Sequence, residues 1–177
     1  MGKFLMYKQE LQDAMTMLGQ DTRTIFLGQA VAYPGTGMYD TLENVSMDKR
    51  IEMPVAEDMQ MGMSIGLSLQ GYIPISIYPR FDFLMCAMNQ LVNHLDKCEE
   101  MSSGEFIPHV IVRTAVGAKS PLYPGVQHCS DYTEGLSVIL KNMRVTKLED
   151  GDNALQVYEN ALNQRGGHLI VELADYY

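Results

Sequence analysis

Segments typical of strands alternate with segments typical of helices along most of this chain. Short apolar runs bounded by glycine or proline, the pattern of buried strands, cover residues 24–27, 73–78, 109–116 and 169–173, with weaker runs at 50–53 and 143–147. Apolar residues at helical spacing cover residues 4–18, 84–101 and 153–163. Strands separated by helices require crossover connections, which give parallel pairing. The sequence therefore predicts an α/β fold: a mainly parallel, twisted sheet with helices on both faces.

The composition is that of a globular domain and argues against nucleic-acid and membrane partners. Hydrophobic residues make up 46% and charged residues 20% of the 177 residues, which is ordinary for one globular domain spanning residues 1–177. The net charge of -9 repels phosphate backbones, so we expect no nucleic-acid partner. No apolar run reaches the roughly 20 residues that span a bilayer, and the N-terminus lacks the pattern of a secretory signal. We expect no membrane partner.

Cysteine and histidine usage argues against a metal site. The three cysteines form no C-x-x-C pair, so free thiols in a reducing cytoplasm are the simplest interpretation. The four histidines are scattered, and none stands in a zinc-binding spacing. The sequence therefore predicts a cytoplasmic protein without a metal ion ligated by its own side chains.

The segment 59–69 is ambiguous. Its apolar residues fall on every second position, as in a half-buried strand, whereas its methionine and leucine content favours a helix. Pro54 just upstream suits the start of a helix. From the residues alone, both interpretations stay open.

Three side chains follow predicted strands closely enough to serve a ligand. Glu57 stands between the run 50–53 and the segment 59–69, where it either contacts a ligand at the strand end or complements a helix dipole. Phe83 follows the strand 73–78 and either lines a pocket or fills the core. His128 lies in a loop after the strand 109–116, where it either transfers protons or is an ordinary surface histidine.

Several motifs in register resemble one family. Their order matches the pyrimidine-binding domain of thiamine-diphosphate enzymes of the transketolase and 2-oxo-acid dehydrogenase group, most closely the N-terminal half of the E1 β subunit. The matching segments are Ile25-Phe26-Leu27-Gly28, Pro54-Val55-Ala56-Glu57, Gly71-Tyr72-Ile73-Pro74, Phe81-Asp82-Phe83, Asn89-Gln90-Leu91-Val92-Asn93, Val110-Ile111-Val112-Arg113-Thr114, Gln127-His128-Cys129 and Leu169-Ile170-Val171-Glu172. The resemblance favours a helix for residues 59–69.

The resemblance also implies roles for individual residues. The glutamate matching Glu57 hydrogen bonds to, or protonates, N1′ of the cofactor aminopyrimidine, which favours the imino form that removes the proton from thiazolium C2. Phe83 is implied to stack on the pyrimidine ring, and His128 to assist proton transfer at the reacting centre. Gln29 is implied to lie near the cofactor, at a position where many relatives carry an acidic residue.

The resemblance further implies a split enzyme. The Gly-Asp-Gly…Asn-Asn signature of the diphosphate-binding and Mg²⁺-binding domain is missing from the sequence, and the chain ends where an E1 β subunit continues into a C-terminal domain. We therefore expect thiamine diphosphate to be shared with an E1 α-like partner that binds Mg²⁺, in an α2β2 assembly. The expected reaction is decarboxylation or dehydrogenation of a 2-oxo acid, or ketol transfer.

Two other functions are compatible with the residues. One is a non-catalytic assembly or regulatory relic of the same fold, which Gln29 and the absent domains favour. The other is an unrelated flavodoxin-like domain that binds a flavin or a nucleotide at its strand ends. The loop 117–124 and Pro79-Arg80 depart from the family pattern, so the substrate cannot be carried over.

Overall fold

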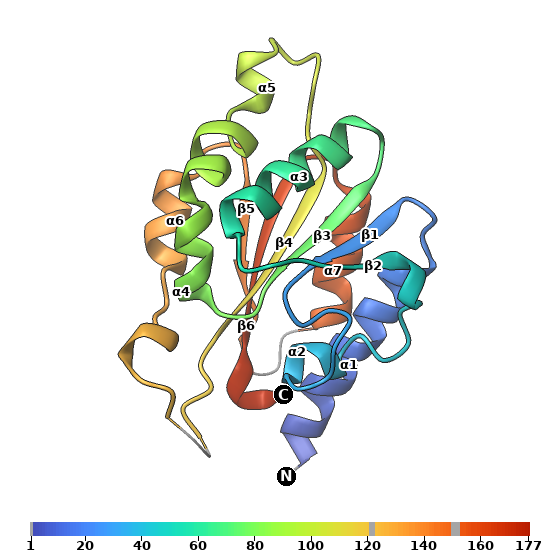
Figure 1. Ribbon diagram of the computed structural model, residues 1–177, viewed down its shortest axis with the longest axis vertical. Helices are drawn as coiled ribbons and strands as arrows, with labels where there is room; N and C mark the ends of the chain where they lie inside the picture. The colour runs from blue at the N-terminus through green and yellow to red at the C-terminus, as the bar shows by residue number, and fades with distance from the viewer. Residues whose placement is uncertain (1, 121–122, 150–152) are drawn as a thin grey trace.

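A parallel sheet in the order β2-β1-β3-β4-β6-β5 organises this computed structural model, which describes residues 2–120, 123–149 and 153–177. The strands are β1 (Thr24–Gly28), β2 (Arg50–Glu52), β3 (Ile73–Tyr78), β4 (Val110–Val116), β5 (Arg144–Lys147) and β6 (Gly167–Leu173), and all their pairings are parallel (Figure 1). Every residue of β3 is buried, because helices cover both faces of the central strands. The predicted α/β fold is confirmed.

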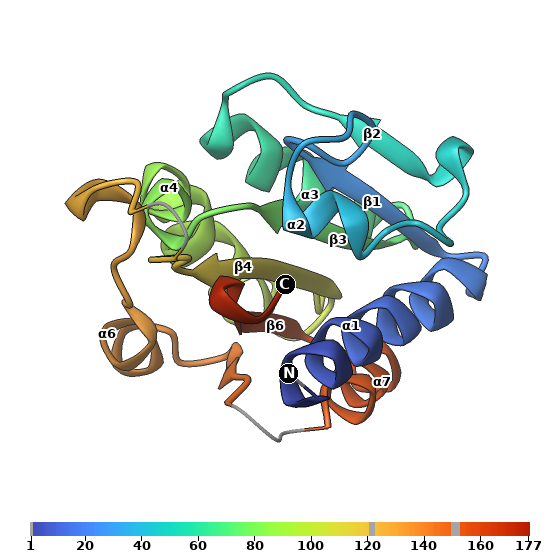
Figure 2. The ribbon, with the colours of Figure 1, turned by 90° about the horizontal axis from the view of Figure 1, so that it is seen from below.

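Helices lie on both faces of this sheet. They are α1 (Gly2–Gln20), α2 (Gly37–Asp40), α3 (Glu57–Leu69), α4 (Phe81–Leu84), α5 (Cys98–Met101), α6 (Thr133–Ile139) and α7 (Ala154–Asn163). Figure 2 shows α1 and α7 side by side on one face, with α3 and α4 across the sheet from them. Each face has its own apolar core; Phe26 and Ile75 belong to the α1/α7 side, and Val112 and Leu169 to the α3/α4 side. Helix α7 begins where Asn153 accepts a hydrogen bond from the backbone N–H of Gln156.

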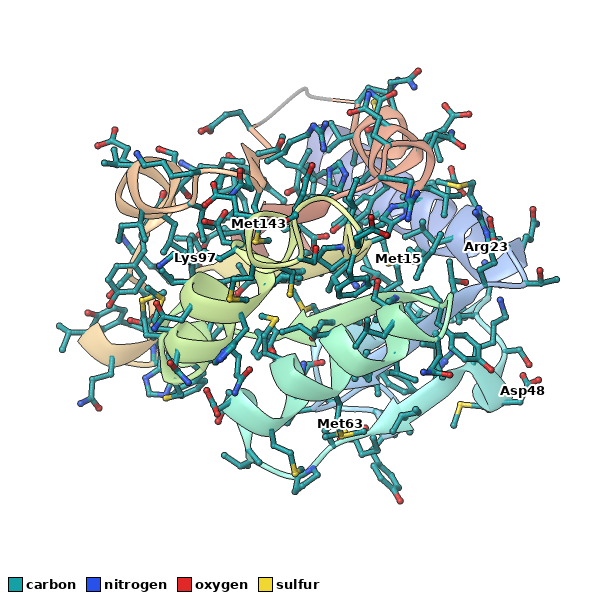
Figure 3. The ribbon with its side chains drawn as sticks, turned by 90° about the horizontal axis from the view of Figure 1, so that it is seen from above. Met15, Arg23, Asp48, Met63, Lys97 and Met143 are labelled. Carbon is teal, nitrogen blue, oxygen red and sulfur yellow. The ribbon has the colours of Figure 1, made fainter. Side chains whose placement is uncertain are left out.

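Helix α3 resolves the ambiguous segment, and its burial pattern explains the ambiguity. Its buried face carries Gln60, Ser64 and Ser68 at a spacing of four residues, together with Met61. Met63 lies on the outer side of α3, away from the sheet (Figure 3). The apolar residues of this segment are therefore divided between its two faces, and apolar periodicity could not reveal the helix.

The expected helix over residues 84–101 is only partly confirmed: the chain is helical through Leu95, but the helix type changes along it and a turn at residues 96–97 separates it from α5. The chain forms the short helix α4, a 3-10 turn η2 (Met85–Ala87), a π-helical segment η3 (Asn89–Leu95) and then α5. The buried carboxylate of Asp96 ends η3 and accepts backbone N–H bonds from Lys141, Asn142 and Met143. The helix stops here because this side chain binds the connection that leads into β5. Helix α6 was not predicted; Leu136 is its one buried residue, so its sequence carries little apolar periodicity.

An ion pair links β4 to β6 inside the core. Arg113 donates from Nε to Oε1 of Glu172 over 2.7 Å and from Nη2 to Oε2 over 2.8 Å, and both side chains are fully buried. The hydroxyls of Tyr158 and Tyr177 also donate to the Glu172 carboxylate. Burial without such partners would be costly for either charge, so this network is part of the core. Among the described helices, none has the length and apolar character to cross a membrane.

Candidate functional site

The strand order reverses between β1 and β3. The chain moves from β1 to β2 on one side and then returns to β3 on the other side of β1. In open α/β sheets, ligands bind outside the carboxyl ends of the strands where the order reverses in this way. Figure 1 shows the connection from β2 crossing the sheet to reach the start of α3. This edge of the sheet is therefore the candidate site.

All four residues singled out by the sequence follow strand ends at this edge. Gln29 follows β1, Glu57 is the first residue of α3 after β2, and Phe83 is in α4 after β3. His128 ends the 3-10 turn η4 (Val126–His128), which follows β4. Four segments far apart in the sequence thus bring these side chains to one edge of the sheet.

Gln29 and Glu57 are in direct contact. The Gln29 amide Nε2 donates a hydrogen bond to Glu57 Oε1 over 3.2 Å. Glu57 is only 8% exposed, and its carboxylate stands at the N-terminus of α3, where the helix dipole favours negative charge. This position fits the helix-dipole interpretation of Glu57, and the contact with a ligand at the strand end stays a prediction.

Two polar residues that the sequence did not single out fix the start of α3. The buried Gln60 donates from Nε2 to Ile77 O over 2.9 Å and to Ser76 Oγ over 3.2 Å. Tyr78 donates from its hydroxyl to the backbone O of Glu57 over 3.3 Å, and burial raises the pKa of Tyr78. Nothing in the local sequence distinguishes such residues from surface polar residues, because their partners come from other elements.

The loop after Gln29 is held by another carboxylate. Glu52, the last residue of β2, accepts backbone N–H bonds from Ala30, Val31 and Ala32 at 2.7 to 2.9 Å. Ala30 has a φ of 56°, a left-handed conformation that is uncommon outside glycine. The Glu52 bonds stabilise this turn, which directs the chain away from the site immediately after Gln29.

Phe83 and His128 form the second contact pair. Their rings meet edge to face, with centroids 5.3 Å apart and planes at 89°. Phe83 is 37% exposed, so it is not the core residue that the sequence also allowed. His128 Nδ1 is buried and has no hydrogen-bond partner among the described residues. A polar atom of this kind is available to a group that binds against it.

Arg80 holds the loop that carries His128. Its Nη1 donates to Gly117 O over 3.0 Å and to His128 O over 3.2 Å. The unusual Pro79-Arg80 sequence thus has a structural role at this site. Within the described residues, no hydrogen bond or ring contact joins the Phe83–His128 pair to the Gln29–Glu57 pair.

The site has no cluster of metal ligands of its own. In the described parts of the chain, no three histidine, cysteine, aspartate or glutamate side chains converge. A cation near this edge would therefore need ligands from elsewhere.

Comparisons with known proteins identify its relatives. No family model matches the chain. It is 28% identical over 172 residues to the pyruvate dehydrogenase E1 component subunit β of Rickettsia bellii, a match that covers 88% of this chain and 52% of the relative. It is 30% identical over 142 residues to a 3-methyl-2-oxobutanoate dehydrogenase subunit β of Mycobacterium tuberculosis, covering 76% of this chain and 38% of the relative. The chain thus spans about half the length, or less, of these relatives.

Solved structures with the same fold are also found. A split-gene transketolase, described as an inactive β4 tetramer, aligns with a TM-score of 0.72 and 19% identity. The alignment covers 95% of this chain and 51% of the transketolase chain. A thiamine-diphosphate-dependent 4-hydroxybenzoylformate decarboxylase of Rhodococcus jostii aligns with a TM-score of 0.65 and 13% identity, covering 94% of this chain and 30% of its own. The chain is thus a homologue of the E1 β subunits of 2-oxo-acid dehydrogenases, with the α/β fold found in thiamine-diphosphate-dependent enzymes.

Proposed function

We propose that this chain is the pyrimidine-binding subunit of a split thiamine-diphosphate-dependent enzyme. Its reaction takes place next to a carbonyl group, either decarboxylation or dehydrogenation of a 2-oxo acid or ketol transfer. The observation that carries this proposal is the shielded Glu57 carboxyl at the strand-order reversal, bonded to Gln29. Homology to E1 β subunits supports it.

The residues at this edge fit an aminopyrimidine ring. Such a ring needs an acid for its N1′ atom and an apolar surface for its face, and this edge offers the Glu57 carboxyl and the partly exposed Phe83 ring. The unpartnered Nδ1 of His128 adds a group that can accept or donate a proton. When bound, thiamine diphosphate supplies a nucleophilic carbon and an electron sink for chemistry next to a carbonyl.

Each side chain then has a distinct task. Glu57 holds a proton at N1′ of the pyrimidine, and its burial keeps water from competing for that hydrogen bond. Gln29 orients the Glu57 carboxyl through its amide. Phe83 supports the ring face, and His128 moves a proton at the reacting carbonyl or orients the acceptor.

The remaining half of the site belongs, in this proposal, to a partner. An E1 α-like subunit binds the diphosphate and its Mg²⁺, and the two kinds of chain form an α2β2 assembly. Support comes from the homology to β subunits of 2-oxo-acid dehydrogenases and from the split-gene transketolase of the same fold, whose β4 tetramer is described as inactive. The three free cysteines suit a reducing, cytoplasmic location.

Calorimetry with thiamine diphosphate and Mg²⁺ tests the proposal. We expect tight binding to a mixture of this chain with its E1 α-like companion, and binding at least tenfold weaker to either chain alone. Equal affinity for the isolated chain and for the mixture would contradict a site shared between subunits.

A second candidate is a non-catalytic assembly module of the same fold. The observation that favours it is the Gln29 amide at a position where many relatives carry an acidic residue. This candidate predicts that the mixed subunits assemble, as measured by light scattering, but bind no thiamine diphosphate. The calorimetric titration with thiamine diphosphate therefore distinguishes the two candidate functions.

A further inference from the structure

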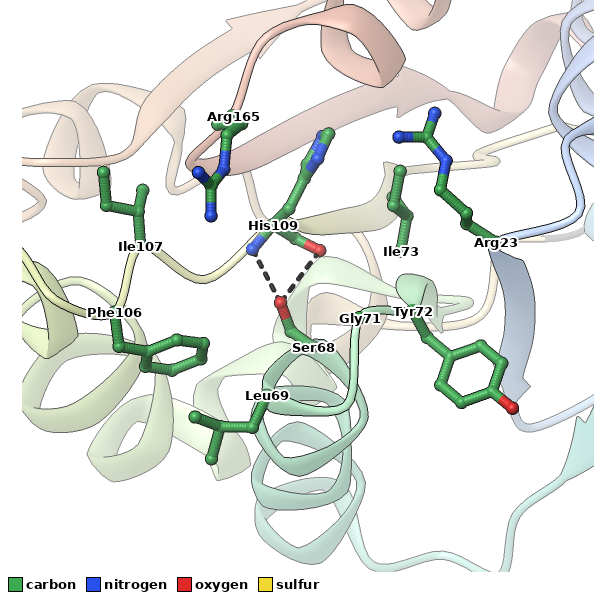
Figure 4. A pocket seen from close by; sticks show the side chains of 10 residues that line it. All are labelled: Arg23, Ser68, Leu69, Gly71, Tyr72, Ile73, Phe106, Ile107, His109 and Arg165. Atoms are coloured by element: carbon green, nitrogen blue, oxygen red, sulfur yellow. Dashed lines mark hydrogen bonds between the residues drawn. The ribbon is translucent and has the colours of Figure 1, made fainter.

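A cavity lies at the edge of the sheet opposite the candidate site, beside the amino ends of β3 and β4. It has a volume of about 300 Å³, and the end of α3, the segment before β4 and the segment before β6 surround it (Figure 4). Its lining residues are Arg23, Ser68, Leu69, Gly71, Tyr72, Ile73, Phe106, Ile107, His109 and Arg165. No residue of the candidate site described above lines it, so the function proposed there does not use it.

Arg165 is the cation of this cavity that lacks a counter-charge. Within the described residues, no carboxylate pairs with its guanidinium. Arg23, on the other side of His109 in Figure 4, donates from Nε and Nη2 to the Asp21 carboxylate at 3.0 and 2.6 Å. Those bonds lower the pKa of Asp21 to about 2, so Asp21 stays ionised and neutralises Arg23. Arg165 is an exposed residue that lines the cavity, so an anion can reach its guanidinium from solvent.

His109 contributes shape rather than charge. Its Nε2 lies 2.8 Å from Ala161 O, and since a carbonyl only accepts, Nε2 carries the proton and donates. Burial, with smaller effects from the Arg23 and Arg165 charges, lowers the pKa of His109, so the ring is neutral at pH 7. Ser68 Oγ accepts from the His109 backbone N–H over 2.7 Å, which fixes this wall of the cavity to α3.

Four apolar side chains form part of the cavity wall. Leu69, Ile73, Phe106 and Ile107 line the cavity, and Leu69 is 56% exposed. Figure 4 shows the Arg165 guanidinium near Ile107, on the same side of the cavity as the Phe106 ring. A strongly hydrated inorganic ion would gain nothing from these walls, whereas an apolar body attached to an anionic group would be removed from water.

We propose that this cavity binds a small organic oxyanion, an apolar body of one ring or a few carbons that carries a carboxylate or a phosphate. Arg165 receives the oxyanion through two parallel N–H···O bonds, the geometry that a guanidinium offers to both groups. The apolar body packs against Phe106, Ile107 and Leu69. Because this site is separate from the Glu57 edge, the proposal does not depend on the proposed function.

Calorimetry on the full chain tests this site with three probes of similar size: benzoate, phenyl phosphate and uncharged benzamide. We expect saturable binding of benzoate or phenyl phosphate with a stoichiometry of about one per chain, and at least tenfold weaker binding of benzamide. The tighter of the two anions identifies whether the site prefers a carboxylate or a phosphate. Binding of neither anion, or equal binding of benzamide, would overturn the proposal.

Variants locate the binding. Arg165→Gln removes the unpaired guanidinium and should weaken binding of the anion at least tenfold. Arg165→Lys should give an intermediate loss, because lysine keeps the positive charge but lacks the two parallel N–H donors of a guanidinium. Lys141→Gln is the matched control: it removes one positive charge near the amino end of β5 from a residue that does not line the cavity. Circular dichroism checks that each variant is folded. Unchanged affinity in Arg165→Gln, or an equal loss in Lys141→Gln, would contradict the assignment.

Discussion

Gln29 donates its side-chain amide to the Glu57 carboxyl over 3.2 Å, which joins the end of β1 to the start of α3. An acid in place of Gln29 would set two carboxyl groups against each other at this distance, and they would either repel each other as carboxylates or share a proton. The amide avoids that competition. Glu57 can therefore be oriented by a neighbour without sharing a proton with it.

Replacing Glu57 by its amide tests its role directly. We expect Glu57→Gln to lower the turnover number of the complex with the companion subunit by about 100-fold or more, because the amide cannot hold the proton at N1′. The free energy of unfolding should change little. Steady-state kinetics at saturating cofactor measures the effect. Asp58→Asn, the next residue of the same helix and an exposed one, is the matched control and should keep its activity; an equal loss in both variants would argue against a specific role for Glu57.

Introducing an acid at position 29 tests the Gln29–Glu57 contact. Gln29→Glu should lower the free energy of unfolding by about 1–2 kcal/mol at pH 8, because two carboxylates repel each other in a half-buried site. The loss should disappear near pH 4, where one carboxyl is protonated and can donate to the other. Urea unfolding at both pH values measures this. Gln29→Met removes the hydrogen bond without adding charge, so its cost should not depend on pH; the same pH dependence in both variants would refute this explanation.

The buried Arg113–Glu172 pair predicts a large effect on stability. Glu172→Gln should lower the free energy of unfolding by about 3–5 kcal/mol, because it leaves the Arg113 charge buried without a counter-charge. The exposed Glu134 in α6 provides the control, since Glu134→Gln should change stability by less than about 0.5 kcal/mol. Urea unfolding measures both. A Glu172→Gln variant as stable as the control would show that the ion pair contributes nothing to the fold.

Histidine burial predicts a pH dependence just below neutrality. Burial lowers the pKa of both His109 and His168 below the usual value of 6.5, so the unfolded chain takes up protons more readily than the folded one. This stability is fully present above pH 6.5 and is lost as the pH falls below it. Urea unfolding at pH 7.5, 6.5 and 5.5 should show a falling free energy. His168→Gln should reduce that slope; an unchanged slope would mean that His168 makes no contribution.

The sequence predicted the fold well where burial follows apolar residues. The central strands are continuous apolar runs because helices cover both of their faces. Such runs can be recognised from the sequence alone. Helix α3 needed the family resemblance, since its buried face is made of Gln60, Ser64 and Ser68. The break after Leu95 could not be predicted, because it depends on Asp96 binding a segment some 45 residues away.

Sequence reasoning located the candidate residues that follow strand ends and missed the residues that support them. Glu57 and Phe83 could be placed because parallel strands bring their carboxyl ends to one edge, a property of topology. Gln60, Tyr78 and Glu52 were missed because each acts through backbone atoms of other elements. Their partners become neighbours only after the sheet has formed. The roles of Glu57, Phe83, His128 and Gln29 stay predictions until the variants are measured.

The Arg80 bonds to Gly117 and His128 have a consequence for the proposed function. Arg80 directly precedes α4, the helix that contains Phe83. Its guanidinium donates hydrogen bonds to the backbone carbonyls of Gly117 and His128, which lie at the two ends of one loop. Phe83 and His128 are thus both held next to Arg80, Phe83 through α4 and His128 through its backbone carbonyl. If the proposed function holds, substitutions between Gly117 and His128 would alter the contacts with a substrate while Arg80 keeps Phe83 and His128 together.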